Sequence, residues 1–196
     1  MNRAYTQASN GSKPYQALIL RRHGFKIPRT ILTNLPDEAQ NFIERCESGA
    51  IFKSISGIRS IVQRVNAERL RDIDLVGNCV TQFQEYIHGT EIRVHVIEDQ
   101  VFATEISSVA VDYRYASREG LETSMRIFSL PDEVSERCIT VTKELGLVMS
   151  GIDLRRTTDG EYYCFEVNPS PGYSYYELHT GQEMSRALID TLRTDL

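Results

Sequence analysis

Two runs of strand-forming residues flank an Asp-Gly pair in the stretch IDLRRTTDGEYYCFEVN, which spans residues 152–168. An Asp-Gly pair in this setting is the strongest short-range signal for a β-hairpin. A two-residue turn at Asp159 and Gly160 therefore predicts an antiparallel pair of strands. The residues that such a turn pairs are Thr158 with Glu161, Leu154 with Phe165, and Asp153 with Glu166. The hairpin thus brings two acidic side chains directly opposite each other.

Asp153, Glu166 and Asn168 form a candidate cation site on this hairpin. Glu166 and Asn168 share a face because side chains alternate along a strand, and paired residues on neighbouring strands have Cβ atoms roughly 5 Å apart. Two carboxylates at that separation repel each other, whereas a divalent cation would make the pair favourable. Oxygen ligands suit Mg²⁺, which in turn indicates phosphate chemistry. The alternative reading is a solvated polar face of the hairpin.

The composition is that of a globular protein: 196 residues, 41% hydrophobic and 25% charged, enough for one domain or two small lobes. A formal net charge of −5 argues against general nucleic-acid binding, which needs a basic surplus. The apolar runs are too short for a membrane span, so no membrane partner is expected. The four cysteines are widely spaced, which predicts reduced thiols in a cytoplasmic protein, and the scattered histidines predict no zinc site.

Hydrophobic periodicity and Gly/Pro signals predict an α+β chain. The expected helices span residues 13–23, 36–49, 131–145 and 181–193. Their expected inward residues include Val134, Cys138, Val141 and Leu145 on the third, and Met184, Leu188 and Leu192 on the last. Besides the hairpin, the expected extended segments span residues 27–32, 50–53, 58–65, 80–87, 91–97 and 100–106. We expect two α+β lobes, residues 1–82 and 83–196, joined near residues 84–87.

Several cationic side chains are candidates for phosphate binding. The chain has no P-loop, dinucleotide-binding or hydrolase nucleophile motif, so phosphate contacts must come from other residues. The candidates are Lys13, Lys53, Arg93 and Arg114. On the strand over residues 91–97, Glu91, Arg93 and His95 point away from the apolar face, and we expect His95 to lie on a solvated surface. Alternatives are a snorkelling surface lysine for Lys53 and a surface ion pair with Asp112 for Arg114.

Four motifs in order resemble the ATP-grasp ligases. Residues 166–172, EVNPSPG, are similar to the metal-binding end of that family, and residues 151–153, GID, resemble its preceding strand. Residues 84–87, QEYI, followed by Gly89 and by EIRV at 91–94, resemble the hinge and the strand after it. The resemblance is strongest to ligases that add glutamate to a ribosomal protein and to peptide-maturing enzymes. It implies an ATP-grasp fold, in which ATP lies between the two antiparallel sheets of two α+β lobes.

The resemblance also implies roles for individual residues. Those implied for ATP binding are Lys13 and Lys53 at the phosphates, Gln84, Glu85, Tyr86 and Ile87 in the hinge, and Glu91 at the ribose. The catalytic arginines implied near the γ-phosphate and the acyl-phosphate are Arg93 and Arg114. The ligands implied for one or two Mg²⁺ ions, with Mn²⁺ as an alternative, are Asp153, Glu166 and Asn168.

The activity that this resemblance implies is ATP-dependent ligation of a carboxylate to an amine through an acyl-phosphate, with release of ADP and phosphate. The substrates would be amino acids or peptides. Alternatives on the same scaffold are phosphotransfer to a small molecule and a non-catalytic ATP-binding subunit. Family members carry a further domain before the residue that matches Lys13, and only residues 1–12 precede it here. We therefore expect a homodimer partner, a separate subunit or a reduced substrate site in its place. Tyr173, Tyr175 and Tyr176 either line a substrate pocket or pack under the last helix.

Overall fold

The structure is a computed structural model that describes residues 2–3, 5–6, 12–55, 62–108 and 123–194. It divides into two compact units. Unit 1 comprises Met1–Ile27, Gly89–Ser107 and Thr123–Leu196, and unit 2 comprises Pro28–His88 and Ser108–Glu122. The predicted lobes divide the chain once, between residues 82 and 83, whereas these units group the first 27 residues with the C-terminal part.

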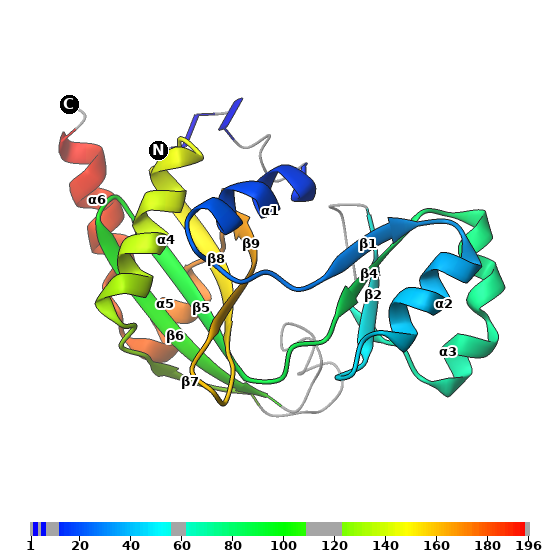
Figure 1. Cartoon of the computed structure of the whole chain (residues 1–196). Helices are drawn as coiled ribbons and strands as arrows, with labels where there is room; N and C mark the ends of the chain where they lie inside the picture. The colour runs from blue at the N-terminus through cyan, green and yellow to red at the C-terminus, as the bar shows by residue number, and fades with distance from the viewer. Residues whose placement is uncertain (1, 4, 7–11, 56–61, 109–122, 195–196) are drawn as a thin grey trace. The chain divides into compact units, whose positions relative to one another are not determined.

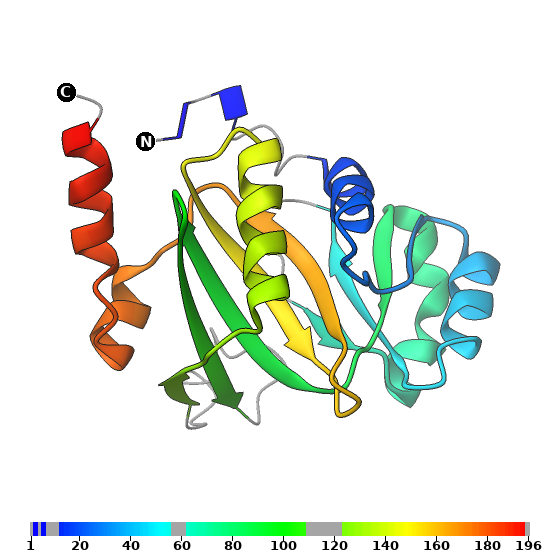
Figure 2. The ribbon, with the colours of Figure 1, turned by 60° about the vertical axis from the view of Figure 1, so that its left-hand side comes forward.

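Unit 1 is built on a five-stranded sheet with the strand order β7-β6-β5-β8-β9. Its strands are β5 (Thr90–Ile97), β6 (Gln100–Ser108), β7 (Thr123–Ile127), β8 (Met149–Arg156) and β9 (Tyr162–Asn168). Its helices are α1 (Lys13–Arg22), α4 (Asp132–Glu144), α5 (Ser174–Thr180) and α6 (Met184–Thr194). Helices α1 and α4 cover one face of the sheet, and α5 and α6 lie on the other side (Figures 1 and 2).

The hydrophobic core of unit 1 lies between the sheet and helices α1 and α4. Its members include Ile19, Leu20, Val94, Val134, Cys138, Val141, Ile152 and Val167. The four residues predicted to face inward from α4 are buried, which confirms the helical spacing. On α6, Met184 and Leu188 are buried as predicted, but Leu192 is 45% exposed, so that part of the prediction is wrong. Because Ala187 is also buried, the inward face of α6 is turned away from Leu192.

Unit 2 contains a four-stranded antiparallel sheet with the order β1-β4-β2-β3. Its strands are β1 (Thr30–Thr33), β2 (Ala50–Ser54), β3 (Gln63–Arg64) and β4 (Thr81–Glu85). Its helices are α2 (Pro36–Glu44), α3 (Ala67–Arg71) and the 3₁₀ helix η2 (Ile73–Asn78). Two antiparallel sheets accompanied by helices confirm the predicted α+β class. Hydrophobic periodicity did not predict α3, η2, β7 or α5, which are all short. Within the described ranges, no helix has both the length and the apolar character that a membrane span requires.

Candidate functional site

The β8–β9 hairpin has the predicted acidic pair but a different turn. The Thr157 N–H donates to the Glu161 carbonyl oxygen at 2.9 Å, so the turn holds three residues, 158–160, instead of two. Gly160 has φ 87°, the left-handed conformation that ends a turn of this kind. The predicted pairing of Thr158 with Glu161 is therefore wrong.

A β-bulge then shifts the register of the hairpin by one residue. Leu154 pairs with Cys164, not with Phe165 as predicted, and the register shifts between Asp153 and Leu154. Phe165 is thus an extra residue on β9, and beyond it Asp153 lies opposite Glu166. The predicted acidic pair is confirmed, because the longer turn and the bulge each shift the register by one residue in opposite directions.

The acidic pair shares one face of the sheet with the predicted arginine. Asp153 pairs with Arg93 on β5, and Gly151, two residues earlier on β8, pairs with Asn168. Residues two apart on a strand share a face. The face of the sheet opposite the core therefore carries one polar surface, formed by Arg93, Asp153, Glu166 and Asn168. We call these four residues the polar face of unit 1.

Cations already neutralise both carboxylates. Nη1 of Arg93 lies 2.5 Å from Oδ1 of Asp153, and Nζ of Lys13, the first residue of α1, lies 3.9 Å from Oε2 of Glu166. The Arg93 side chain is 8% exposed, whereas the carboxylate side chains are 27% and 25% exposed. A buried guanidinium is thus held by a carboxylate that solvent and ligands reach. Ion pairs of this kind offset the repulsion between the two acids.

Gly151 makes room for the Arg93 side chain. A Cβ atom at this position would lie 2.2 Å from Nη2 of Arg93 and 2.5 Å from Cβ of Pro171. Any side chain at Gly151 would therefore displace the guanidinium from Asp153 or move the segment after β9. The glycine in the GID motif has a local steric explanation.

His95 is buried, so the prediction of a solvated surface position is wrong. Its exposure is 0%, its Nε2 lies 3.2 Å from the Gly172 carbonyl oxygen, and its ring packs 4.8 Å from that of Tyr176. Burial, assisted by the positive charge of Arg93, lowers the pKa of His95 to about 4, so the imidazole is neutral near pH 7. The reason for the error is α5, which covers this end of the polar side of the sheet.

The tyrosines after Gly172 have separate environments. Tyr176 is 7% exposed, and its ring lies 4.8 Å from that of His95. Tyr175 is 49% exposed, and its ring lies 4.3 Å from that of His179.

The predicted hinge residues lie on and after β4 in unit 2. The side chains of Glu85 and Arg29 form an ion pair at 3.0 Å, and the Glu85 N–H donates to the Arg29 carbonyl oxygen at 2.9 Å. The Tyr86 N–H donates to the Gly49 carbonyl oxygen at 3.0 Å. Ile87 is buried. The hinge backbone is therefore fixed by its own unit.

Two buried glutamines share a face of β4. Gln84 donates from Nε2 to Thr30 Oγ1 at 3.0 Å, and Gln82 pairs with Lys53 on β2. The Oε1 atoms of Gln82 and Gln84 are buried and have no hydrogen-bond partner among the described residues. A buried acceptor without a partner is costly, so these oxygens suit a ligand that carries N–H or O–H donors. Sequence reasoning selected Gln84 and Lys53 but missed Gln82, although the alternation along β4 places it on the same face.

Glu91 and Arg114 are the remaining predicted site residues. Oε2 of Glu91, the predicted ribose contact, lies 3.6 Å from Nη2 of Arg155. Arg114 lies outside the described residues.

The polar face has ligands of the right chemistry for Mg²⁺. Over the described ranges, no three His, Cys, Asp or Glu side chains gather where they could hold a metal. The candidate donor set is instead two carboxylates and one amide oxygen, that of Asn168, which accepts a hydrogen bond from Ser170 N–H at 2.8 Å. Mg²⁺ is commonly held by one or two carboxylates, with water and substrate phosphates completing its coordination. The residues present therefore fit a Mg–nucleotide complex.

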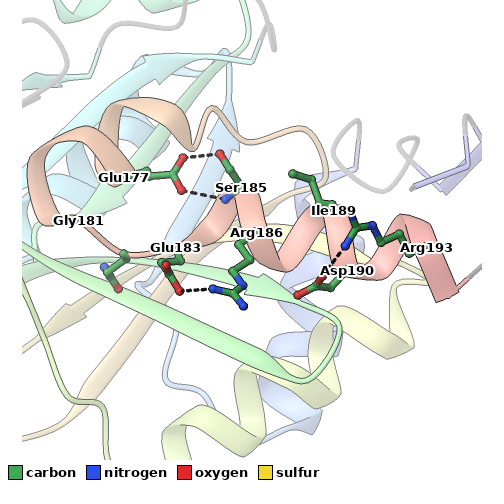
Figure 3. Close-up of a pocket in the computed structure, with 9 residues that line it drawn as sticks. Glu177, Gly181, Glu183, Ser185, Arg186, Ile189, Asp190 and Arg193 are labelled. Carbon is green, nitrogen blue, oxygen red and sulfur yellow. Dashed lines mark hydrogen bonds and ion pairs between the residues drawn. The ribbon is translucent and has the colours of Figure 1, made fainter.

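A surface pocket on α5 and α6 is a second candidate (Figure 3). Its charged groups are largely engaged with their neighbours. Glu177 accepts hydrogen bonds from the N–H and Oγ of Ser185, and Glu183 lies 3.8 Å from Arg186. The predicted site residues lie elsewhere in the described part of the chain. We therefore assign the candidate site to the polar face.

Comparison with known proteins identifies the class to which this fold belongs. The ATP-grasp ligase PsnB, complexed with a phosphomimetic variant of a minimal precursor, Mg and ADP, aligns with a TM-score of 0.83 and 29% identity, over 96% of this chain and 59% of that chain. The same ligase with precursor peptide PsnA2 and AMPPNP gives 0.82 and 26%, over 98% and 61%. The fold is therefore an ATP-grasp fold.

The sequence places the chain within that class. Residues 9–192 match the model of the RimK-like ATP-grasp domain, and the chain belongs to this family. A probable alpha-L-glutamate ligase of Haemophilus influenzae (strain ATCC 51907 / DSM 11121 / KW20 / Rd) is 28% identical over 201 residues, which cover 96% of this chain and 64% of the relative. The chain thus spans slightly less than two thirds of the length of that relative.

Proposed function

We propose that this chain is an ATP-dependent carboxylate–amine ligase that forms an amide or peptide bond through an acyl-phosphate and releases ADP and phosphate. The observation that carries the proposal is the pairing of Asp153 and Glu166 across β8 and β9, each with its own cation, Arg93 or Lys13. Such a surface combines oxygen ligands for Mg²⁺ with positive groups for phosphate oxygens, the two requirements of phosphoryl transfer.

Mg²⁺, when bound, would neutralise phosphate charge and hold the phosphates in line with the attacking carboxylate. Asp153, Glu166 and Asn168 would hold it as one or two ions, with Mn²⁺ as a substitute. Arg93 sits beside Asp153 with little freedom, so it would keep its charge directed at the transferred phosphoryl group. Arg114 would act on the acyl-phosphate. No protein nucleophile takes part, because the substrate amine attacks the activated carboxylate.

The nucleotide-binding residues of this proposal are those that the sequence predicted. In this proposal Lys13 and Lys53 contact the phosphates, and Glu91 contacts the ribose. The hinge residues Gln84, Glu85, Tyr86 and Ile87 would face the adenine. The buried Oε1 of Gln84 supports this role, because it can accept a hydrogen bond from a ligand amino group.

The substrates are proposed to be a peptide or amino acid that supplies the carboxylate and a second group that supplies the amine. The complex of PsnB with a precursor peptide and the name of the glutamate ligase relative support these substrate classes. All four cysteines are free thiols, which supports the predicted cytoplasmic location.

The test is product analysis with Mg-ATP and panels of peptides, amino acids and amines. Formation of ADP, free phosphate and an amide is expected. ADP with a phosphorylated product and no free phosphate would contradict ligation. Glu166→Ala should abolish Mg-dependent turnover, because it leaves Asp153 as the only carboxylate of the proposed ligand set.

Glu161→Ala is the matched control. Glu161 precedes the same strand and pairs with Lys26 at 3.2 Å, so this variant removes a carboxylate and an ion pair from the same hairpin. Its turnover should remain normal. Equal loss of turnover in both variants would show that the hairpin is merely fragile and would remove the support for the metal assignment.

A further inference from the structure

The side chain of Gln16 is bound to the main chain of the strand that carries the predicted metal ligands. Its Nε2 donates to the Val167 carbonyl oxygen at 2.7 Å, and its Oε1 accepts from the Val167 N–H at 3.1 Å. Gln16 lies in α1 and is 2% exposed. Since β9 is the last strand of its sheet, this amide occupies the place where a further strand would pair.

The bond is made to the residue between Glu166 and Asn168. The Val167 side chain is buried in the core, and its two neighbours point to the polar face. Two hydrogen bonds to one residue fix the rotation of its main chain. They therefore set the direction of both neighbouring side chains.

The bulge at Phe165 determines which face of the sheet Glu166 occupies. Strict pairing from the turn would continue the register of Tyr162, Tyr163 and Cys164, and it would place Phe165 opposite Asp153. Glu166 would then lie opposite Ile152 and point into the core, because a slip of one residue exchanges the faces of a strand. Burial of Val167 in place of Glu166 favours the bulged register, and the two hydrogen bonds from Gln16 to the Val167 main chain favour the same arrangement.

We propose that Gln16 is a positioning residue that holds β9 in the bulged register and so keeps Glu166 and Asn168 on the polar face. The inference deepens the function proposed above and rests on it for the role of those two residues. Helix α1 then acts on Glu166 through two of its residues. Lys13 neutralises Glu166, and Gln16, one turn later, fixes the strand on which Glu166 lies.

The downstream segment supports this reading. Asn2 donates from Nδ2 to the Pro169 carbonyl oxygen at 2.6 Å, and His95 Nε2 lies 3.2 Å from the Gly172 carbonyl oxygen. Contacts from three different parts of the chain thus hold residues 167–172. The Gln16 contact is the one that lies between the two predicted ligands.

The test compares the wild-type protein with Gln16→Met, which keeps the size of the side chain and removes both hydrogen bonds. Cross-strand NMR contacts should place Asp153 opposite Glu166 in the wild type. In Gln16→Met they should shift toward Phe165, and the Val167 amide proton should exchange faster. Gln16→Asn, whose amide is one methylene too short to reach both groups, gives the same comparison if the first variant does not fold.

Metal binding is measured separately with Mn²⁺ and ADP, by the electron paramagnetic resonance signal of free Mn²⁺. Loss of the anchor should weaken Mn²⁺ binding by about tenfold or more, as for other residues that orient metal ligands. The control is Thr142→Val, which removes the buried 2.6 Å hydrogen bond between Thr142 and Ser150 in the same unit. It should lower stability comparably and leave Mn²⁺ affinity and the β9 register unchanged.

The outcomes separate this inference from the proposed function. An unchanged register with unchanged Mn²⁺ affinity in Gln16→Met would overturn the positioning role, and so would an equal loss of affinity in Thr142→Val. A wild-type protein that binds Mn²⁺ but forms no product would refute the proposed ligation while the comparison of register and affinity still decides the role of Gln16. A wild-type protein that binds no Mn²⁺ would refute the metal assignment, while the register comparison would still decide whether Gln16 holds β9.

Discussion

Acidification below pH 6.5 should destabilise unit 1 through His95. In the unfolded chain this imidazole has its ordinary pKa of 6.5, whereas burial beside Arg93 lowers the pKa in the folded protein to about 4. Between these values the unfolded state binds a proton that the folded state does not. The free energy of unfolding therefore falls as the pH falls through this window, and the loss is complete below pH 4.

The size of the effect follows from the shift. One pKa unit corresponds to about 1.4 kcal/mol, so the full loss is about 3 kcal/mol, of which about 2 kcal/mol has appeared by pH 5. The value applies to a side chain with 0% exposure, so solvent screening does not reduce it appreciably. For a unit of this size the loss is a large fraction of total stability.

The assay compares the wild type with His95→Gln from about pH 7.5 to pH 5. The glutamine amide does not titrate in this range, and its Nε2 is expected to donate to the Gly172 carbonyl oxygen in place of the imidazole. Urea unfolding is followed by hydrogen exchange in peptides from β5 and β8, which reports on unit 1. The acidic groups with lowered pKa, such as Glu177, are common to both proteins and cancel in the difference. Parallel pH profiles for the two proteins would refute the reasoning.

Two further perturbations test the steric role of Gly151 and the burial of the thiols. Gly151→Ala would place a Cβ atom 2.2 Å from Nη2 of Arg93, so Mg-dependent turnover should fall by about tenfold or more while the circular dichroism spectrum is retained; turnover equal to that of the wild type would contradict the steric role of Gly151. Among the four thiols only Cys79 is exposed, and burial raises the pKa of Cys138 to about 12, so a thiol reagent should modify Cys79 rapidly and Cys138 only on unfolding; modification of both at one rate would contradict this.

The sequence was most informative where local chemistry is decisive. Pro at the first turn of α1 and Gly24 after it predicted that helix to within one residue. The alternation in β5 predicted which side chains face the core, and Val94 pairs with Ala103 accordingly. These features depend on neighbours within a few residues, so a pattern alone is sufficient.

The burial of His95 on the polar side of the sheet depends instead on α5, a helix that hydrophobic periodicity did not predict. Alternation placed His95 on the side opposite the core, and that placement was correct. The prediction that the His95 side chain is solvated was wrong, because Tyr176 on α5 covers it. A short helix of seven residues with three aromatic or histidine side chains carries little periodic signal. The same reasoning applies to Leu192, whose exposure depends on how α6 is turned against the sheet.

The predicted acidic pair is correct, but the turn from which it was predicted is not. Turn rules count residues from Asp159 and Gly160, and they placed Glu166 opposite Asp153 with a turn that is one residue too short. The structure reaches the same pair because Phe165 is inserted as a bulge. Turn rules do not predict that bulge, whereas the amide of Gln16, 151 residues away along the chain, binds Val167, two residues after it. The geometry of the candidate metal site is therefore a tertiary property of α1 and β9 together, and substitutions in α1 should reach it without touching a metal ligand.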